Sequence, residues 1–224
     1  MVEAKAVIAV LGGTGHEGMG LAARWAKAGY PVIIGSRDAA RAVDAAQLMA
    51  ARTGGQVNGM DNRAAAAAGE IIVLAVPYAG QQALARDVRA EIEGKILIDV
   101  TVPLVPPKVA RVQLPEGGSA VEALQRELGD GVRVVAAFQN VSAHQLADLD
   151  RTVNCDVLVA GDDVAARETV CQLAQAIGIT ALHSGPLANS AAAEALTSVL
   201  IAINKRYKVA DGAGIRITGI PGLA

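Results

Sequence analysis

The stretch "AVIAVLGGTGHEGMGLAARWAKAGYPVIIGSRDAARA", residues 6–42, places a glycine-rich loop between two apolar runs. The loop follows a predicted strand over residues 5–11 and opens a predicted helix over 17–28. In that setting, residues 13–18 read as a GxGxxG motif. Such glycines permit a tight turn and let a pyrophosphate approach the backbone at a helix N-terminus. The stretch therefore predicts a dinucleotide site, with extra room at Gly12 and Gly20.

The end of the second predicted strand, residues 31–35, indicates which dinucleotide binds. Ser36 and Arg37 stand where sites selective for NAD usually carry an acidic residue. A hydroxyl and a planar guanidinium suit a phosphate, and Arg41 lies one helical turn further on. These residues favour NADP(H). The alternative is that both arginines are solvated cations paired with Asp38 or Asp44.

The pattern of short β-branched runs and Ala-rich helical segments predicts a mainly parallel sheet covered by helices. Predicted strands cover residues 5–11, 31–35, 56–60, 70–76, 95–100 and 132–137, and predicted helices cover 17–28, 38–52, 61–68, 79–92 and 119–128. Two later strands, in 154–161 and 179–185, flank a helix over 163–177, and a long helix covers 189–208. We expect a Rossmann-type, doubly wound α/β fold. Residues 1–140 would form its NADP-binding domain, and residues 141–224 a smaller C-terminal part of helical and mixed structure.

Composition argues against several classes of protein. The formal net charge is −2, so no global basic field favours nucleic acid. No apolar stretch reaches the roughly 20 residues of a membrane span, since "ALTSVLIAIN" is too short. Cys155 and Cys171 form no CxxC pair and are expected to be two buried thiols. These features predict a cytoplasmic protein.

The chain is poor in groups that would supply acid–base chemistry. No Tyr-xxx-Lys and no HExxH occurs, and the three histidines lack the spacing of a metal site, so no metal is expected. His16 lies in the glycine loop, where it is placed to contact a phosphate. His144 alone lies near a plausible reaction site and is the one weak candidate for a catalytic side chain. A reaction that needs hydride placement without a protein acid or base fits this inventory best.

Seven segments, in order, resemble the coenzyme F420-dependent NADP oxidoreductase family. They are "LGGTGHEGMGLA", "GSRDAAR", "VLAVPYAG", "VAAFQNVSAHQLADLD", "DVLVAGDD", "GPLANS" and "GIRITGI". The resemblance covers nearly the whole chain. It implies hydride transfer between the nicotinamide of NADP(H) and the deazaflavin coenzyme F420, so that both partners are carbon hydride carriers.

The resemblance also implies roles for individual residues. The loop residues Thr14, Gly15, His16 and Glu17, beside Gly12 and Gly13, would contact the pyrophosphate. Ser36, Arg37 and Arg41 would hold the 2′-phosphate. Val76, Pro77, Val102, Pro103 and Ala143 would flank the nicotinamide, and the deazaflavin would lie across it. For Val76, Val102 and Ala143, ordinary core packing is the alternative.

Other functions and an oligomeric state also follow from the sequence. One alternative is an NADPH-dependent reductase of a small carbonyl, imine or flavin, which needs a proton from Tyr78, Asp99 or His144. A second is a non-enzymatic NADP sensor. An apolar stripe on the last helix predicts a homodimer; it consists of Ala192, Ala195, Leu196, Val199, Leu200 and Ile203.

Overall fold

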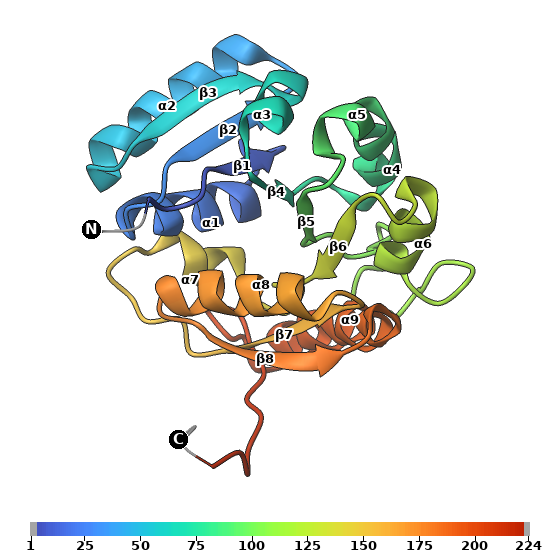
Figure 1. The fold of residues 1–224 in the computed structure, drawn as a ribbon. Coiled ribbons are helices and arrows are strands. Elements are labelled where there is room, and N and C mark those ends of the chain that lie inside the picture. The colour runs from blue at the N-terminus through green and yellow to red at the C-terminus, as the bar shows by residue number, and fades with distance from the viewer. Residues whose placement is uncertain (1–3, 222–224) are drawn as a thin grey trace.

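Eight strands form one sheet in the computed structural model, which describes residues 4–221 (Figure 1). The strands are β1 (Ile8–Leu11), β2 (Val32–Ser36), β3 (Val57–Asp61), β4 (Ile71–Leu74), β5 (Ile96–Asp99), β6 (Arg133–Ala136), β7 (Asp156–Gly161) and β8 (Thr180–Gly185). Their order across the sheet is β3-β2-β1-β4-β5-β6-β7-β8. All neighbouring strands are parallel except β6 and β7, so the sheet is mainly parallel, and the Rossmann-type α/β fold expected from the sequence is confirmed.

The helices follow the strands along the chain. They are α1 (His16–Lys27), α2 (Ala39–Thr53), α3 (Asn62–Ala68), α4 (Tyr78–Asp87), α5 (Arg89–Ile92), α6 (Ala120–Leu128), α7 (Ala143–Ala147), α8 (Val164–Ala176) and α9 (Ser190–Tyr207). The segment expected as one helix over 79–92 is divided at Val88 into α4 and α5. The five-residue α7 was not expected, because so short an element has no recognisable period.

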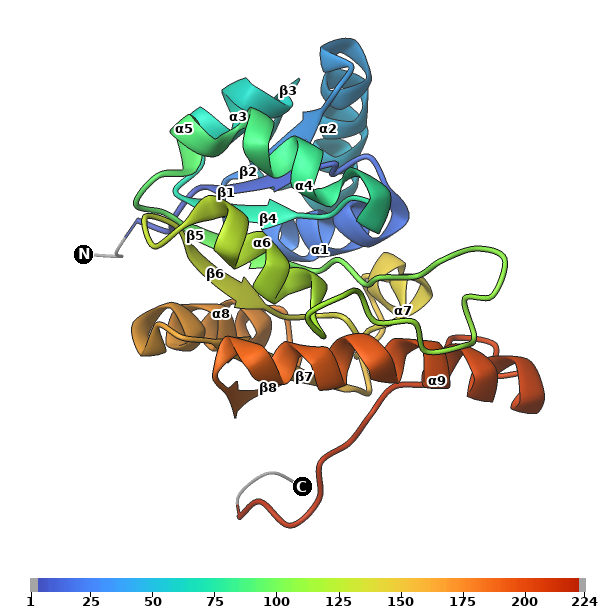
Figure 2. The same ribbon diagram turned by 90° about the vertical axis from the view of Figure 1, so that its right-hand side faces the viewer.

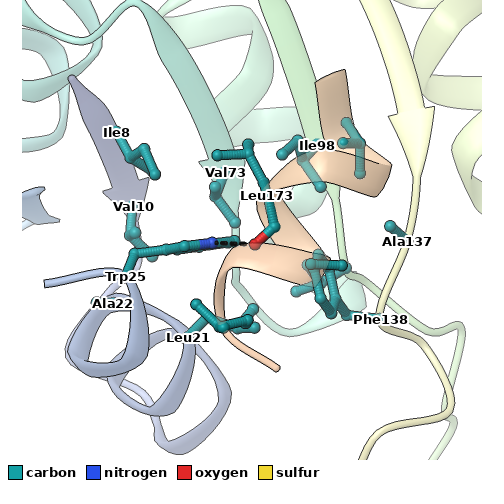
Figure 3. Close-up of a cluster of buried hydrophobic side chains, with 14 of the residues drawn as sticks. Ile8, Val10, Leu21, Ala22, Trp25, Val73, Ile98, Ala137, Phe138 and Leu173 are labelled. Atoms are coloured by element: carbon teal, nitrogen blue, oxygen red, sulfur yellow. Dashed lines mark hydrogen bonds between the residues drawn. The ribbon is translucent and has the colours of Figure 1, made fainter. Parts of the chain in front are cut away.

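Alternate strand residues enter two separate cores, as the pleat requires. Ile8 and Val10 point to the face covered by α1, α2 and α8, whereas Ala9 and Leu11 point to the face covered by α3, α4 and α6. In the first core, Trp25 of α1 lies against β1 and β4 and donates its indole N–H to the Leu173 carbonyl of α8 at 3.0 Å (Figure 3). This bond ties the glycine-loop helix to a helix from the C-terminal part of the chain.

The last helix, α9, lies where the sequence predicted a long helix over 189–208. With the short 3₁₀ helix η1 (Leu187–Asn189), α9 makes a 21-residue helix with an 18-residue window of mean hydropathy 1.3, which by length and composition alone is enough to cross a membrane. The expectation that no segment is long enough is therefore wrong on these criteria. The helix packs along α6 and β7 (Figure 2). Its buried Glu194 accepts the backbone N–H of Ala120 at 2.8 Å, at the start of α6.

Candidate functional site

The carboxyl ends of four neighbouring parallel strands, β2, β1, β4 and β5, meet at one edge of the sheet. The register pairs Leu11 with both Gly35 and Leu74, and Leu74 with Asp99, so the loops after β1, β2, β4 and β5 begin side by side. The strand order reverses between β1 and β4, since β2 lies on one side of β1 and β4 on the other. Open α/β sheets bind ligands at this point. The edge is therefore the candidate site.

Two glycines of the loop are required by the fold itself. Gly12 has a φ of +71°, and a Cβ there would lie 2.4 Å from Cγ1 of Val76. A Cβ on Gly13 would lie 2.6 Å from the Val10 carbonyl oxygen. Asn62 of α3 accepts the Gly12 N–H at 3.3 Å and fixes the turn from the other side. This contact had no sequence signal. The structure thus brings Gly12 and Val76 together, as expected for two parts of one site.

Gly15 differs, because nothing in the fold requires it to lack a side chain. Its φ of −80° and ψ of 162° suit any residue, and a Cβ there would meet only the Gly12 carbonyl, at 3.5 Å. The residue is exposed at the N-cap of α1, with Thr14 and His16 beside it. An exposed glycine that packing does not demand is explained by the close approach of a ligand.

The cationic residues after β2 are free to meet an anion. Asp38 accepts the Arg41 backbone N–H at 3.2 Å and so caps α2. The side chains of Arg37 and Arg41 are exposed, and within residues 4–221 neither lies within 4.0 Å of a carboxylate. The pairing with Asp38 or Asp44 is therefore absent from this part of the chain. Ser36 is buried at the end of β2, and its Oγ accepts the Asp38 N–H at 3.2 Å.

The segments after β4 and β5 are held together by a side-chain bond. Thr101 donates its hydroxyl to the Val76 carbonyl at 3.4 Å, which places Val102 beside the end of β4. Pro77 is the N-cap of α4, and Pro103 is buried. Val76 and Val102 are partly exposed at this edge, as residues that flank a ligand must be.

Ala143 and His144 begin α7 and share a cavity of about 440 Å³ with the glycine loop. The cavity runs between α1, α2 and α7, and His144 is exposed at it. Its lining consists of Thr14, His16, Met19, Gly20, Ala23, Leu48, Met49, Arg52, Ala143, His144 and Ala147. The residues from α2 were missed by sequence reasoning, because only the fold brings that helix to the loop.

Asp99, considered above only as a proton source, is fully buried at the end of β5. It accepts the Thr101 N–H at 2.9 Å and a hydrogen bond from the Gln81 amide, and its own carbonyl accepts the Gln139 amide at 2.8 Å. Burial is the main cause that raises its pKa from 3.8 to about 6, and the nearby Glu194 adds to the rise. Asp99 thus joins α4 to the segment after β5 through its carboxyl, and it holds the segment after β6 through its backbone carbonyl.

Titratable side chains do not gather into a metal site in the described part of the chain. Within residues 4–221, no group of three or more His, Cys, Asp or Glu is placed to hold a metal ion. Cys155 and Cys171 are both buried and unpaired, as expected.

A first test of the loop uses the difference between its glycines. We expect Gly15→Val to fold with near-wild-type stability, because a Cβ there has space, yet to weaken NADPH and NADH alike, because the side chain fills the pyrophosphate position. Gly12→Ala should instead lower the unfolding midpoint, because of its φ and its contact with Val76. Urea unfolding and titration of both dinucleotides measure these effects. Unchanged affinity in Gly15→Val would contradict the assignment of the loop.

Comparisons with known proteins extend these observations. The sequence pattern of the family described as "NADP oxidoreductase coenzyme F420-dependent" matches residues 7–103. The F420-dependent NADP reductase of Methanothermobacter marburgensis is 43% identical over 96% of this chain and 99% of its own length. That of Methanocaldococcus jannaschii is 40% identical over 95% of this chain and 98% of its own. A solved structure of a candidate F420-dependent NADP-reductase from Arthrobacter sp. FB24 has a TM-score of 0.77 at 27% identity, over 91% of this chain and 96% of that one.

Proposed function

Because this chain belongs to the family of coenzyme F420-dependent NADP oxidoreductases, we propose that it transfers a hydride between NADP(H) and the deazaflavin coenzyme F420. The observation that carries this proposal is the 43% identity to an F420-dependent NADP reductase along 99% of that protein. The chain is accordingly an oxidoreductase, with NADP(H) and F420 as its cofactor and co-substrate.

The residues at the sheet edge fit NADP(H). We assign the pyrophosphate to the loop from Gly12 to Glu17, because Gly15 offers space that the fold does not use. The 2′-phosphate is assigned to Ser36, Arg37 and Arg41, because both guanidinium groups lack a carboxylate partner in the described residues. The nicotinamide then lies by Val76, Pro77, Val102 and Ala143. The bound nicotinamide and deazaflavin supply the hydride-donating and hydride-accepting carbons.

The work of the protein is to align the two rings and to exclude water. Residues 141–224 are proposed to complete the F420 cleft. Two contacts support this: Thr197 donates its hydroxyl to the Gln139 carbonyl at 2.8 Å, and the Asn140 amide donates to the Ala193 carbonyl at 2.8 Å. Both hold α9 against the segment between β6 and α7. No acid or base is needed for a direct hydride transfer, so His144 has a positioning role at most.

The function is tested by mixing the purified protein with NADPH and F420 and following the absorbance of both cofactors. NADPH and F420 are expected to be consumed in equal amounts. The direction of hydride transfer is expected to follow the ratio of the oxidised and reduced cofactors supplied. A panel of small carbonyl compounds, imines and flavins serves as the comparison. NADPH oxidation with that panel and none with F420 would favour the alternative reductase, and binding without any turnover would favour the sensor.

We further propose that α9 forms a homodimer interface. The apolar stripe read from the sequence lies largely outside the protomer: Val199 is 42% and Ile203 36% exposed, and Tyr207, one turn further, is 73% exposed. Leu200 is the exception and is buried within the protomer. The face that packs inward instead carries Ser190, Ala193, Glu194, Ser198 and Leu200. An exposed apolar stripe of this kind is typical of an interface.

Ile203→Glu combined with Val199→Glu is expected to convert a dimer to a monomer at micromolar concentration, because two carboxylates would be buried at the interface. Light scattering coupled to gel filtration gives the mass. Val164→Glu is the matched control, since Val164 is 65% exposed on α8 and its replacement should leave the mass unchanged. A wild-type protein that is monomeric at this concentration would contradict the proposal.

We propose that the protein acts in the cytoplasm, without binding nucleic acid or a membrane. Its two unpaired, buried cysteines suit a reducing compartment. The net charge of −2 offers no basic field. Although α9 is apolar enough for a membrane, it carries Glu194, which is bonded to the start of α6 inside the protein. Fractionation of host cells tests this location.

A further inference from the structure

Glu17 is the one acidic side chain in the glycine loop, and it has no partner in the described part of the chain. It stands in the first turn of α1, between Gly15 and Gly18. Its Oε1 is buried, and no hydrogen-bond partner for it lies within residues 4–221. Burial raises the pKa of the Glu17 carboxyl from 4.5 to about 8. At neutral pH the group is therefore mostly an uncharged acid.

The helix geometry shows which face of α1 carries Glu17. Glu17, Gly20 and Arg24 share one face of α1, because they are three and seven residues apart. On that face, a Cβ on Gly20 would lie 2.6 Å from Cβ of Leu146 in α7, and Arg24 donates hydrogen bonds to the carbonyls of Leu146 and Asp148. Figure 1 shows α7 lying along α1.

This face of α1 borders the cavity that the glycine loop shares with α7. Gly20, one turn after Glu17, lines that cavity together with Thr14 and Ala143. Glu17 stands in the loop between Gly15 and Gly18, so its buried Oε1 is close to the residues assigned to the pyrophosphate.

Charge decides what a carboxyl can do at this position. A carboxylate beside a pyrophosphate repels it, whereas a protonated carboxyl donates a hydrogen bond to an oxygen acceptor. The N-terminus of α1 favours the ionised form, but burial outweighs it. The ionisable groups that line the adjacent cavity are His16 of α1, Arg52 of α2 and His144 of α7, and Arg24 lies on the same face of α1 as Glu17. Burial is the only cause of the shift at Glu17.

We propose that Glu17 binds the dinucleotide as an uncharged hydrogen-bond donor to its pyrophosphate–nicotinamide half, and that loss of this proton releases the cofactor. The inference rests on the proposed binding of NADP(H) and adds a pH-dependent contact to it. Because the contact is to the half that NADPH and NADH share, it acts on both, unlike the contacts of Arg37 and Arg41.

The test is the dissociation constant of NADPH and of NADH between pH 6.5 and 9.5, at one ionic strength and without F420. For the wild-type protein we expect constant affinity below about pH 8 and a loss of about tenfold per pH unit above it, hence roughly 30-fold at pH 9.5. For Glu17→Gln, which keeps an amide donor and cannot ionise, we expect no such loss. Glu122→Gln, also in the first turn of a helix but in α6, should behave as the wild type does.

A second measurement needs no variant. Calorimetry of NADPH binding at pH 8.5, in buffers of different ionisation enthalpy, should show uptake of roughly three-quarters of a proton. No proton uptake, or the same alkaline loss in Glu17→Gln as in the wild type, would overturn the inference. A protein that binds NADPH with this pH dependence but does not reduce F420 would contradict the proposed function alone.

Discussion

Arg24→Ala is expected to lower the free energy of unfolding by about 3–5 kcal/mol. The Arg24 side chain is only 7% exposed and makes four hydrogen bonds to backbone carbonyls. They join it to Leu146 at 3.0 Å, Gln145 at 2.8 Å, Asp148 at 2.5 Å and Arg151 at 3.0 Å. A hydrogen bond to a charged group contributes about 1.5–3 kcal/mol, and truncation leaves these carbonyls without their donor.

The same change should also weaken NADPH binding, because Arg24 holds α7, and with it Ala143, against the glycine-loop helix. Urea unfolding and NADPH titration measure the two effects. Arg24→Lys should recover only part of the stability, since one ammonium cannot reach four carbonyls in the fork geometry of a guanidinium.

Lys27→Ala is the matched control for Arg24 on the same helix. Lys27 pairs with the exposed Asp150 at 2.9 Å, and an exposed ion pair of this kind contributes about 1 kcal/mol or less. A loss in Arg24→Ala no larger than that of Lys27→Ala would show that α7 is held by packing alone.

Arg37→Asp is expected to lower NADPH affinity by about two to three decades and to raise that for NADH. Loss of a charge-assisted bond to the 2′-phosphate removes roughly one to two decades, the effect expected of Arg37→Ala. The new carboxylate adds repulsion of that phosphate. It also accepts hydrogen bonds from the ribose hydroxyls of NADH. The preference therefore moves towards NADH, because NADPH affinity falls while NADH affinity rises.

Titration of both dinucleotides at one stated salt concentration measures this preference, because phosphate contacts are screened. Arg133→Ala is the control, since Arg133 is the first residue of β6, at the amino ends of the parallel strands and away from the candidate site, and it bonds the Gly94 carbonyl. Equal losses of NADPH and NADH in Arg37→Ala would mean that the arginine is only a solvated cation. NADP specificity would then have to come from other residues.

The sequence alone determined the order of the strands and of the longer helices along the chain, and it predicted the place of the dinucleotide. Continuous apolar runs such as residues 71–74 identify strands that are buried on both faces. The glycine loop and Arg37 are local signals, because a tight turn and a phosphate contact need particular residue types at fixed spacing along the chain. The family resemblance, carried by seven ordered segments, extended this to the second cofactor.

Only the tertiary structure decided which distant residues complete the site. Arg24 and Glu17 read as ordinary surface residues of an amphipathic helix, until α7, more than 120 residues later, is seen packed against that helix. Asn62, Arg52 and the buried Asp99 likewise acquire their partners across elements. On α9, the sequence showed an apolar stripe, but the fold turns Glu194 inward and leaves Val199 outside. The physical reason is that the burial and hydrogen bonding of a side chain depend on which element packs against its face of the helix. The hydrophobic periodicity of one segment does not show which element that is.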